Sequence, residues 1–247
     1  GRSRYDLFRE KLGYLDGGSA TLLNGMKQAI EARGGKFRLS TPVTRVTMDH
    51  GKVTGVQTPA GTEAFDRVIS TIPLPYVPQI MPDLPTDILA RYQALKNIAV
   101  VCVIAKLKKP LTDNFWLNTN DPDMDIPGIV EYTNLRPLDR HVVYVPFYMP
   151  GEHPKYQDDD HVFLDKVRRY LKKINPALQD DDFIDIRASR YRHAQPICDP
   201  GYLSKLPPVK LPVEGLWVAD TSYYYPEDRG ISESIGFGRQ MARDAVR

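Results

Sequence analysis

The sequence predicts a mixed α/β fold (α+β in character), in which helices and short strands follow one another without an internal repeat. Three observations predict it. Residues 158–174 have an acidic first turn and apolar residues at helical spacing, as in an amphipathic helix. Residues 43–58 alternate apolar and polar side chains about a His-Gly pair, which is typical of a β-hairpin. Residues 98–107 are almost unbroken apolar, which predicts a central strand buried on both faces.

The first third of the chain predicts one helix and then a group of strands. The helix is expected over residues 19–33, with Ser19 as its N-cap and Gly34-Gly35 ending it. Strands are expected at 36–39, at 43–47 and 52–58 on the two sides of the hairpin turn, and at 62–72.

The middle of the chain predicts a change of domain followed by a sheet. Five prolines between residues 73 and 85 exclude regular structure there and mark a crossing between domains. A short helix capped by Thr86 is expected over residues 86–96. Beyond the apolar run, further strands are expected at 114–117, 128–133, 141–147 and 183–194, and residues 196–212 predict a proline-rich return.

The carboxyl-terminal segment carries the strongest functional signal. A short apolar run from residue 215 ends in Asp220, turn-forming residues follow, and Ser232 opens a helix that continues to the end of the chain. A carboxylate at the end of a strand, facing the N-terminus of a helix, suits a ligand that has hydroxyl groups and partial negative charge. An acid after a strand can also cap the following turn, which is the structural alternative for Asp220.

Composition restricts the class of partner. The chain has 247 residues, 26% of them charged, and a formal net charge of +2. This near balance indicates no nucleic-acid or anionic-membrane partner. No apolar run approaches the roughly 20 residues that span a bilayer, and a cytoplasmic protein with a small-molecule substrate is expected. Two cysteines and five histidines lack metal-ligand spacing, so no metal site is expected.

Several short motifs occur in an order that resembles one known group of proteins. The motifs are Gly17-Gly18-Ser19-Ala20-Thr21-Leu22, Gly34-Gly35, Thr41-Pro42-Val43-Thr44-Arg45-Val46, Gly55-Val56, Asp66 to Pro73, and the segment from Gly215 to Ile235. Together they resemble the C-terminal part of the superfamily of FAD-dependent amine oxidases, phytoene desaturases and UDP-galactopyranose mutase-like flavoproteins.

The resemblance implies cofactor-binding roles for five residues. Val43 would contact the adenine ring through its main-chain N–H and C=O, and Asp220 would hold the ribityl chain. Ile231, Ser232 and Glu233 would present main-chain N–H groups to the flavin pyrimidine. The superfamily usually carries glycine immediately before the acid, whereas this chain carries an alanine there.

The resemblance also implies substrate-binding positions, but it assigns no catalytic residue. The segment that lines the substrate pocket in such proteins resembles the region of Tyr191 and Tyr202. Tyr224, Tyr225 and Arg229 lie between the acid and the flavin-facing helix. An arginine here could meet a phosphate or carboxylate group of a substrate.

A dinucleotide fingerprint, Gly-x-Gly-x-x-Gly, is absent from the sequence. The resemblance therefore implies the distal part of a two-dinucleotide-binding-type FAD domain, formed by residues 1–72 and 213–247. An inserted mixed-sheet domain, residues 73–212, would bind the substrate. Without the fingerprint the pyrophosphate of FAD lacks its usual glycine loop, so we expect this chain alone to carry little FAD and to be inactive.

Three functions are compatible with these features. The first is a fragment of a flavin-dependent oxidoreductase of the amine oxidase-like type, which transfers a hydride from a small organic substrate to FAD. The second is a UDP-galactopyranose mutase-like flavoenzyme that acts on a nucleotide sugar in polysaccharide synthesis. The third is a non-catalytic binding domain, which the absent fingerprint favours.

Overall fold

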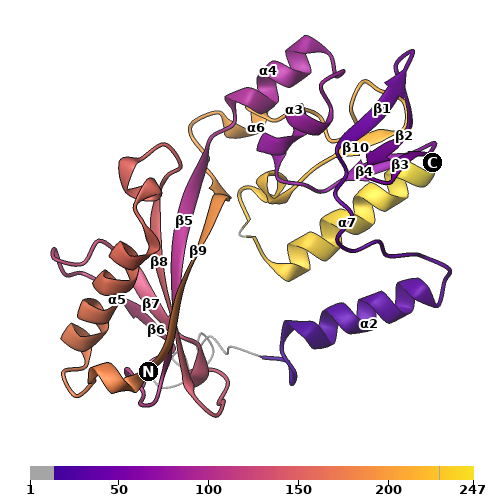
Figure 1. The fold of residues 1–247 in the computed structure, drawn as a ribbon. Coiled ribbons are helices and arrows are strands. Elements are labelled where there is room, and N and C mark those ends of the chain that lie inside the picture. The colour runs from indigo at the N-terminus through magenta and orange to yellow at the C-terminus, as the bar shows by residue number, and fades with distance from the viewer. Residues whose placement is uncertain (1–13, 228) are drawn as a thin grey trace, which may run out of the picture.

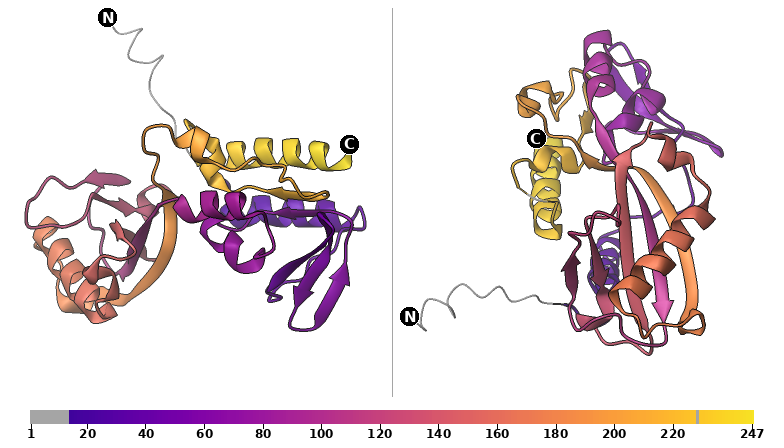
Figure 2. Two further views of the ribbon diagram at one scale, coloured as in Figure 1. Left: turned by 90° about the horizontal axis from the view of Figure 1, so that it is seen from above. Right: turned by 90° about the vertical axis from the view of Figure 1, so that its left-hand side faces the viewer.

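The computed structural model describes residues 14–227 and 229–247, so residues 1–13 of the expected segment 1–72 lie outside the described part. Figure 1 shows two groups of elements joined by a pair of long strands. One group is a five-stranded sheet with a helix on one face. The other contains the carboxyl-terminal helix, and the views in Figure 2 show it extending away from the sheet.

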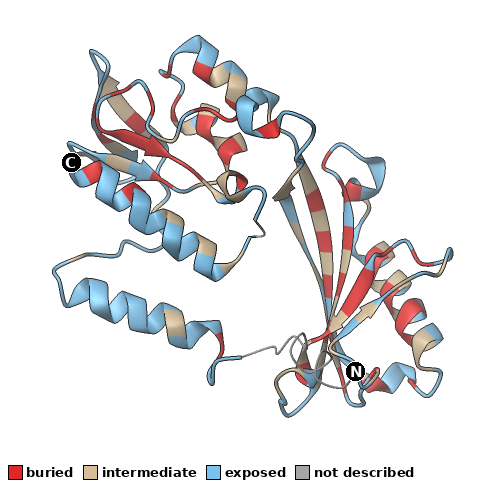
Figure 3. Ribbon diagram, turned by 180° about the vertical axis from the view of Figure 1, so that it is seen from behind, coloured by how far each residue is buried: buried red, intermediate tan, exposed pale blue. Residues whose placement is uncertain are grey.

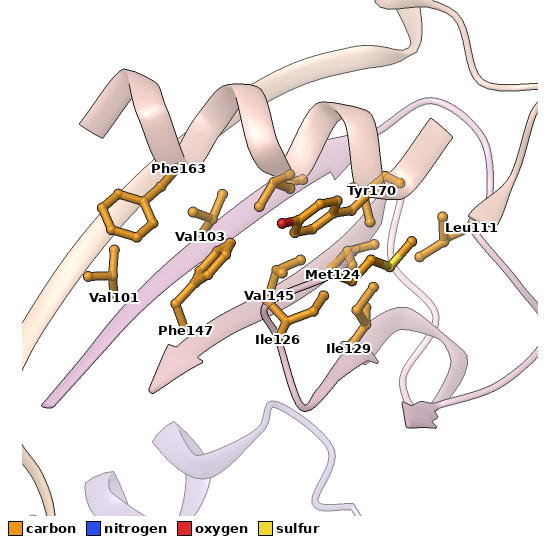
Figure 4. Packing of buried hydrophobic residues seen from close by; sticks show 14 of the residues in the cluster. Val101, Val103, Leu111, Met124, Ile126, Ile129, Val145, Phe147, Phe163 and Tyr170 are labelled. Atoms are coloured by element: carbon orange, nitrogen blue, oxygen red, sulfur yellow. The ribbon is translucent and has the colours of Figure 1, made fainter. Parts of the chain in front are cut away.

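The five-stranded sheet is antiparallel throughout and has the order β6-β7-β8-β5-β9. Its strands occupy Asn97–Leu107 (β5), Trp116–Asn118 (β6), Gly128–Glu131 (β7), His141–Pro150 (β8) and Phe183–Pro196 (β9). Helix α5, Asp160–Ile174, covers one face (Figure 1). Phe163, Val167, Tyr170 and Leu171 are its buried residues, and they complete a cluster with alternate residues of β5 and β8 (Figure 4).

The expectation that residues 98–107 are buried on both faces is wrong. Burial alternates along β5, with Val101 and Val103 fully buried against α5, whereas Ile104 on the other face is 38% exposed. Strands point successive side chains to opposite faces, and α5 covers one face only. The uninterrupted apolar run therefore gives this sheet a second, apolar face that the described residues leave partly open.

The second group is built around two small sheets. β1 (Arg45–Asp49), β2 (Lys52–Thr58) and β3 (Gly61–Ala64) form an antiparallel sheet, and β4 (Val68–Ser70) pairs in parallel with β10 (Leu216–Val218). The expected single strand over residues 62–72 is thus two strands in different sheets. The expected hairpin is confirmed, and its turn places both His50 and Gly51 at positive φ, as a type I′ turn requires.

The proline-rich segment is partly regular, contrary to expectation. It contains a 3-10 turn, η1 (Leu74–Tyr76), and a short helix, α3 (Val77–Ile80), each with a proline in its first turn, where the missing N–H is tolerated. Helix α4 follows at Thr86–Ala94, and Pro85, not Thr86, occupies its N-cap position. The remaining short elements are η2 (Tyr132–Asn134), η3 (Pro154–Gln157), η4 (Asp180–Asp182), α6 (Tyr202–Lys205) and η5 (Thr221–Tyr224).

A second hydrophobic cluster joins these elements across long sequence distances. Residues of β1, β2 and β10 pack in it with residues 74–92 and 202–211. Those two segments fall inside the expected substrate-binding segment 73–212, yet their apolar side chains complete the core around β10. The boundary between the two clusters consequently lies near residues 96 and 197.

The two long helices at the ends of the described chain differ in their packing. α7, Ile231–Val246, contacts Trp217 and Ala219 through Met241 and Ala245. α2, Ser19–Glu31, has no buried residue (Figure 3). Its N-cap is Gly18 instead of the expected Ser19, and Gly34 at positive φ follows its end as expected. No helix in the described ranges is both long and apolar enough to cross a membrane.

The strand expected at residues 36–39 is absent from the structure. Phe37 and Leu39 are exposed, and neither small sheet includes the segment. A strand needs a neighbour that accepts its backbone hydrogen bonds. The described residues provide none here.

Candidate functional site

A cavity of about 360 Å³ lies between the two groups of elements, where β4 and β10 end. Thr71 follows β4, Asp220 follows β10, and both line the cavity. Ligands of open α/β sheets commonly bind beyond the carboxyl ends of parallel strands, and this cavity has that position. The opposite wall comes from β9 and α7, through Tyr191, His193, Ala194, Ser234 and Phe237.

Asp220 is held by two main-chain amides from different parts of the chain. Its Oδ1 accepts a hydrogen bond from Ser222 N at 2.8 Å, which caps η5, and its Oδ2 accepts one from Leu74 N at 2.9 Å. The capping role, the structural alternative for this acid, is therefore present. A carboxylate has about four lone-pair sites, so two accepted bonds leave capacity for a ligand hydroxyl.

The first three residues of α7 do not line the cavity. Ile231, Ser232 and Glu233 begin the helix, but the cavity touches α7 from Ser234 onward. The first amides of any helix lack an intrahelical acceptor and attract negative charge. Here the Glu233 carboxylate lies directly against Gly230, so close that it leaves no room for a Cβ at position 230.

Three of the five expected substrate-binding residues lie together in the cavity wall: Tyr191, Tyr224 and Arg229. Tyr191 comes from β9, and burial raises its pKa. Tyr224 packs against Phe237 of α7, with ring centroids 5.5 Å apart. Arg229 donates from Nη1 to the carbonyl oxygen of Ala194 at 2.5 Å, which ties the segment before α7 to β9.

Tyr202 and Tyr225 lie outside the cavity wall, although they contact one another. Tyr202 is buried in the second cluster, and burial raises its pKa to about 12. Tyr225 is exposed and packs edge-on against the Tyr202 ring at a centroid distance of 5.8 Å. Tyr202 is thus a core residue in this structure, whereas Tyr225 covers its edge.

Val43 lies in a separate hollow of about 580 Å³ beside the three-stranded sheet, with Phe65 and Thr58. It precedes β1 and is not part of a strand. Among the described residues, no hydrogen bond engages its main-chain N–H or C=O. Both main-chain groups of Val43 are therefore available to a ligand.

Sequence reasoning missed Asn97 and Phe237, and it gave His193 no role beyond the segment it shares with Tyr191; all three line the cavity. Tyr76 packs edge-on against the His193 ring, with centroids 4.8 Å apart. Burial lowers the pKa of His193, and the nearby positive charge of Arg192 lowers it further. The only signal for His193 was its proximity in sequence to Tyr191. Within the described ranges, no group of three His, Cys, Asp or Glu side chains could hold a metal ion.

Several solved structures share this fold. An oxidoreductase from Methanosarcina mazei is 19% identical with a TM-score of 0.64, over 83% of this chain and 49% of its own. A putative protoporphyrinogen oxidase from Exiguobacterium sp. 255-15 is 20% identical with a TM-score of 0.65, over 84% of this chain and 47% of its own. A reduced UDP-galactopyranose mutase is 15% identical and has a TM-score of 0.58. The match covers 83% of this chain and 46% of the mutase.

The chain is a mixed α/β structure that spans about half the length of these proteins. At these identities the likeness concerns the fold. The sequence itself gives the family: residues 1–223 match the profile described as flavin containing amine oxidoreductase. Because that match covers most of the chain, the protein belongs to the flavin-containing amine oxidoreductase family.

Proposed function

We propose that this chain forms the ribityl and pyrimidine end of an FAD site in a flavin-dependent oxidoreductase, which transfers a hydride from a small organic substrate. One observation carries the proposal. Asp220 stands at the carboxyl end of a parallel strand pair, in the wall of a cavity shared with α7. The segments around β4 and β10 would belong to the FAD domain, and the sheet unit would supply the substrate-facing wall.

The residues present fit that end of the cofactor. Asp220 keeps unused acceptor capacity for a ribityl hydroxyl, and Ser234, in the first turn of α7, lines the same cavity. Val43, in its separate hollow, has a free main-chain donor and acceptor, which would suit the purine edge at the other end of the cofactor. The glycine fingerprint that would hold the pyrophosphate is absent from this sequence.

The flavin, when bound, supplies the hydride acceptor. The chain's own residues would orient and enclose the reactants. Tyr191 and Tyr224 present ring surface from two sides of the cavity, and Arg229 fixes the segment before α7 against β9. His193 has a lowered pKa, so it is neutral at pH 7 and one ring nitrogen can accept a proton released by the substrate.

The visible spectrum tests the cofactor assignment first. We expect the chain alone to purify with little or no flavin, because the pyrophosphate has no glycine loop, and a protein that also contains a fingerprint unit to be yellow. Anaerobic mixing of that yellow protein with a panel of amines should then bleach the flavin absorbance with at least one of them. If no protein containing this chain binds flavin, the proposal is wrong.

Arg229 supports a second candidate, a mutase-like enzyme that acts on a nucleotide sugar. Its position in the cavity wall would suit a phosphate, and the fold is shared with a UDP-galactopyranose mutase. In the flavin-loaded protein, Arg229→Ala should then abolish binding of a UDP-sugar, measured by calorimetry, whereas the exposed control Arg140→Ala should not. Unchanged UDP-sugar binding in Arg229→Ala, or none in the parent protein, contradicts this candidate.

A third candidate, a non-catalytic binding domain, rests on the missing fingerprint alone. A yellow, substrate-reducible protein excludes it. Stable folding together with a complete lack of flavin in every form of the protein would favour it.

A further inference from the structure

The face of the five-stranded sheet that α5 does not cover is mostly apolar. Alternate residues of β5, β8 and β9 point to this face, since successive side chains of a strand point to opposite sides. The strand register places them in three rows across the sheet: Tyr148, Val100 and Tyr191; Pro146, Cys102 and Ser189; and Tyr144, Ile104 and Arg187.

One end of this face adjoins the cavity described above. Tyr191, which lines the cavity, stands in the first row beside Val100. The third row lies further along β5, at Ile104. At a rise of about 3.3 Å per residue, the rows of Val100 and Ile104 are roughly 13 Å apart along the strand.

The other end of the face meets a positive charge held among tyrosine side chains. Tyr144, in the third row, packs edge-on against Tyr132, with ring centroids 6.1 Å apart. The Tyr132 hydroxyl donates to the hydroxyl of Tyr14, and the Arg136 guanidinium lies 5.6 Å from the centroid of the Tyr14 ring. Gly18 completes the group, because a Cβ there would lie 2.7 Å from Tyr14 Oη and 3.4 Å from Arg136 Nη1.

Arg136 has no acidic partner in the part of the chain that the structure describes. The groups that raise the pKa of its guanidinium are the side chains of Tyr132 and Tyr14, and both are neutral phenols at pH 7. Arg136 is partly exposed, and a guanidinium presents planar N–H donors that fit the two oxygens of a carboxylate. Its single charge also matches that of a carboxylate.

We propose that Arg136 and the uncovered face of the five-stranded sheet bind an elongated apolar carboxylate. The acid group lies on Arg136, and the apolar body lies across Ile104 and Val100 towards Tyr191. This inference rests on the proposed function, because it names the class of substrate for the same cavity. Aliphatic and aromatic side chains suit the body of such a molecule, whereas the guanidinium and the phenol hydroxyls suit its acid group. Because the two ends are roughly 13 Å apart, a short acid cannot contact both.

Calorimetric titration of the purified chain tests the proposal without flavin, because the face and Arg136 both belong to this chain. The probes are decanoate, decanol, which lacks the acid group, and propanoate, which lacks the long body. We expect decanoate to bind, and each of the other two to bind at least about tenfold more weakly. Equal affinities for decanoate and decanol, equal affinities for decanoate and propanoate, or no binding of decanoate would overturn the proposal.

A pair of arginine variants locates the acid group. Arg136→Gln should weaken decanoate binding roughly ten- to a hundredfold and leave decanol binding unchanged. Arg140→Gln is the matched control, because Arg140 is an exposed arginine in the same loop before β8. Unchanged decanoate affinity in Arg136→Gln, or an equal loss in both variants, would contradict the role of Arg136. Equal thermal unfolding temperatures show that both variants remain folded.

A second pair of variants tests the direction of the apolar body. Tyr191→Ala should weaken the binding of decanoate but not of hexanoate, whose chain is too short to reach from Arg136 to the first row. Ile184→Ala should affect neither acid, because Ile184 is similarly exposed in β9 but lies at the irregular end of that strand. An equal effect of Tyr191→Ala on the two acids, or no effect on either, would contradict the path towards the cavity.

Flavin content, measured separately in a protein that also contains a fingerprint unit, distinguishes this proposal from the proposed function. Selective decanoate binding without flavin in any form of the protein keeps the carboxylate site and refutes the FAD site. A yellow protein that does not distinguish decanoate from decanol keeps the FAD site and refutes the carboxylate site.

Discussion

The five-stranded sheet unit and the group around β4 and β10 differ in how completely they bury their own elements. The sheet unit carries a continuous cluster in which α5 closes one face, and its strands are all paired in one antiparallel sheet. The other group divides five strands between two small sheets and leaves α2 without a buried residue. The difference teaches that α5 buries most of its apolar face within the sheet unit, whereas the apolar side chains of α2 in the other group remain exposed.

The largest effect expected from this comparison is on stability. Phe163→Ala removes a ring that is 1% exposed and packs against Phe147, and should lower the free energy of unfolding by about 3–5 kcal/mol. Leu23→Ala in α2 should change it by less than about 0.5 kcal/mol, because that side chain buries nothing. Urea unfolding of the purified chain measures both. Equal losses of unfolding free energy in the two variants would contradict the difference in burial between the two groups.

The next effect concerns the proposed FAD site, in a flavin-loaded protein that contains this chain. Asp220→Ala should weaken flavin binding by about 1.5–3 kcal/mol, roughly ten- to a hundredfold, because it removes a charged acceptor for a ribityl hydroxyl. Tyr224→Phe removes only a hydroxyl and should change flavin affinity less and substrate kinetics more. Flavin fluorescence titration measures the affinities.

Asp220→Ala also deprives Leu74 N and Ser222 N of their acceptor, so its thermal unfolding is compared with that of Asp220→Asn, which keeps an acceptor oxygen. Full flavin occupancy with unchanged affinity in Asp220→Ala would contradict the proposal that Asp220 binds the ribityl chain.

The smallest expected effect is on the pH dependence of stability, and it concerns Asp125 in the sheet unit. This residue connects a loop to α5 through hydrogen bonds to Lys166 and Tyr170. Burial acts to raise the pKa of Asp125, but hydrogen bonds from Lys166, Tyr170 and Lys155 outweigh it and hold this pKa well below its usual range. A depressed folded pKa stabilises the fold above the unfolded value of about 3.9, and this contribution is lost as the pH falls below it.

Asp125→Asn should therefore lower the free energy of unfolding at pH 7 by about 1 kcal/mol, a figure discounted for partial exposure. The variant should also lose less stability than the parent protein as the pH falls. Thermal unfolding between pH 7 and acid pH measures this. Asp165→Asn, on the exposed side of α5, is the control. An unchanged acid limb in Asp125→Asn would show that the loop does not depend on this carboxylate.

Local sequence patterns predicted the sheet unit well because its contacts follow those patterns. The spacing of Phe163, Val167 and Leu171 predicted α5. In the other group, the hairpin turn at His50-Gly51 likewise followed from residues that tolerate positive φ. The parallel pairing of β10 with β4 joins two short apolar runs that lie far apart in the sequence.

The failures occurred where structure depends on a partner that local sequence does not specify. Residues 36–39 have a strand pattern but no neighbour, and Ile104 belongs to an apolar run on an uncovered sheet face. Ser19 was an acceptable cap by residue type, but the chain starts the helix one residue earlier, after Gly18. Tyr202 and Tyr191 could not be distinguished by sequence, because only packing places one in the core and the other at the cavity.

The joint between the two groups is a ribbon of two antiparallel strands. Asn97 pairs with Pro196, Ile197 N donates to Lys96 O at 2.9 Å, and both Asn97 and Pro196 line the cavity. The cavity lies beside this ribbon, and its walls come from both groups. A ligand held by both Asp220 and Tyr191 would therefore add a further link between the two groups.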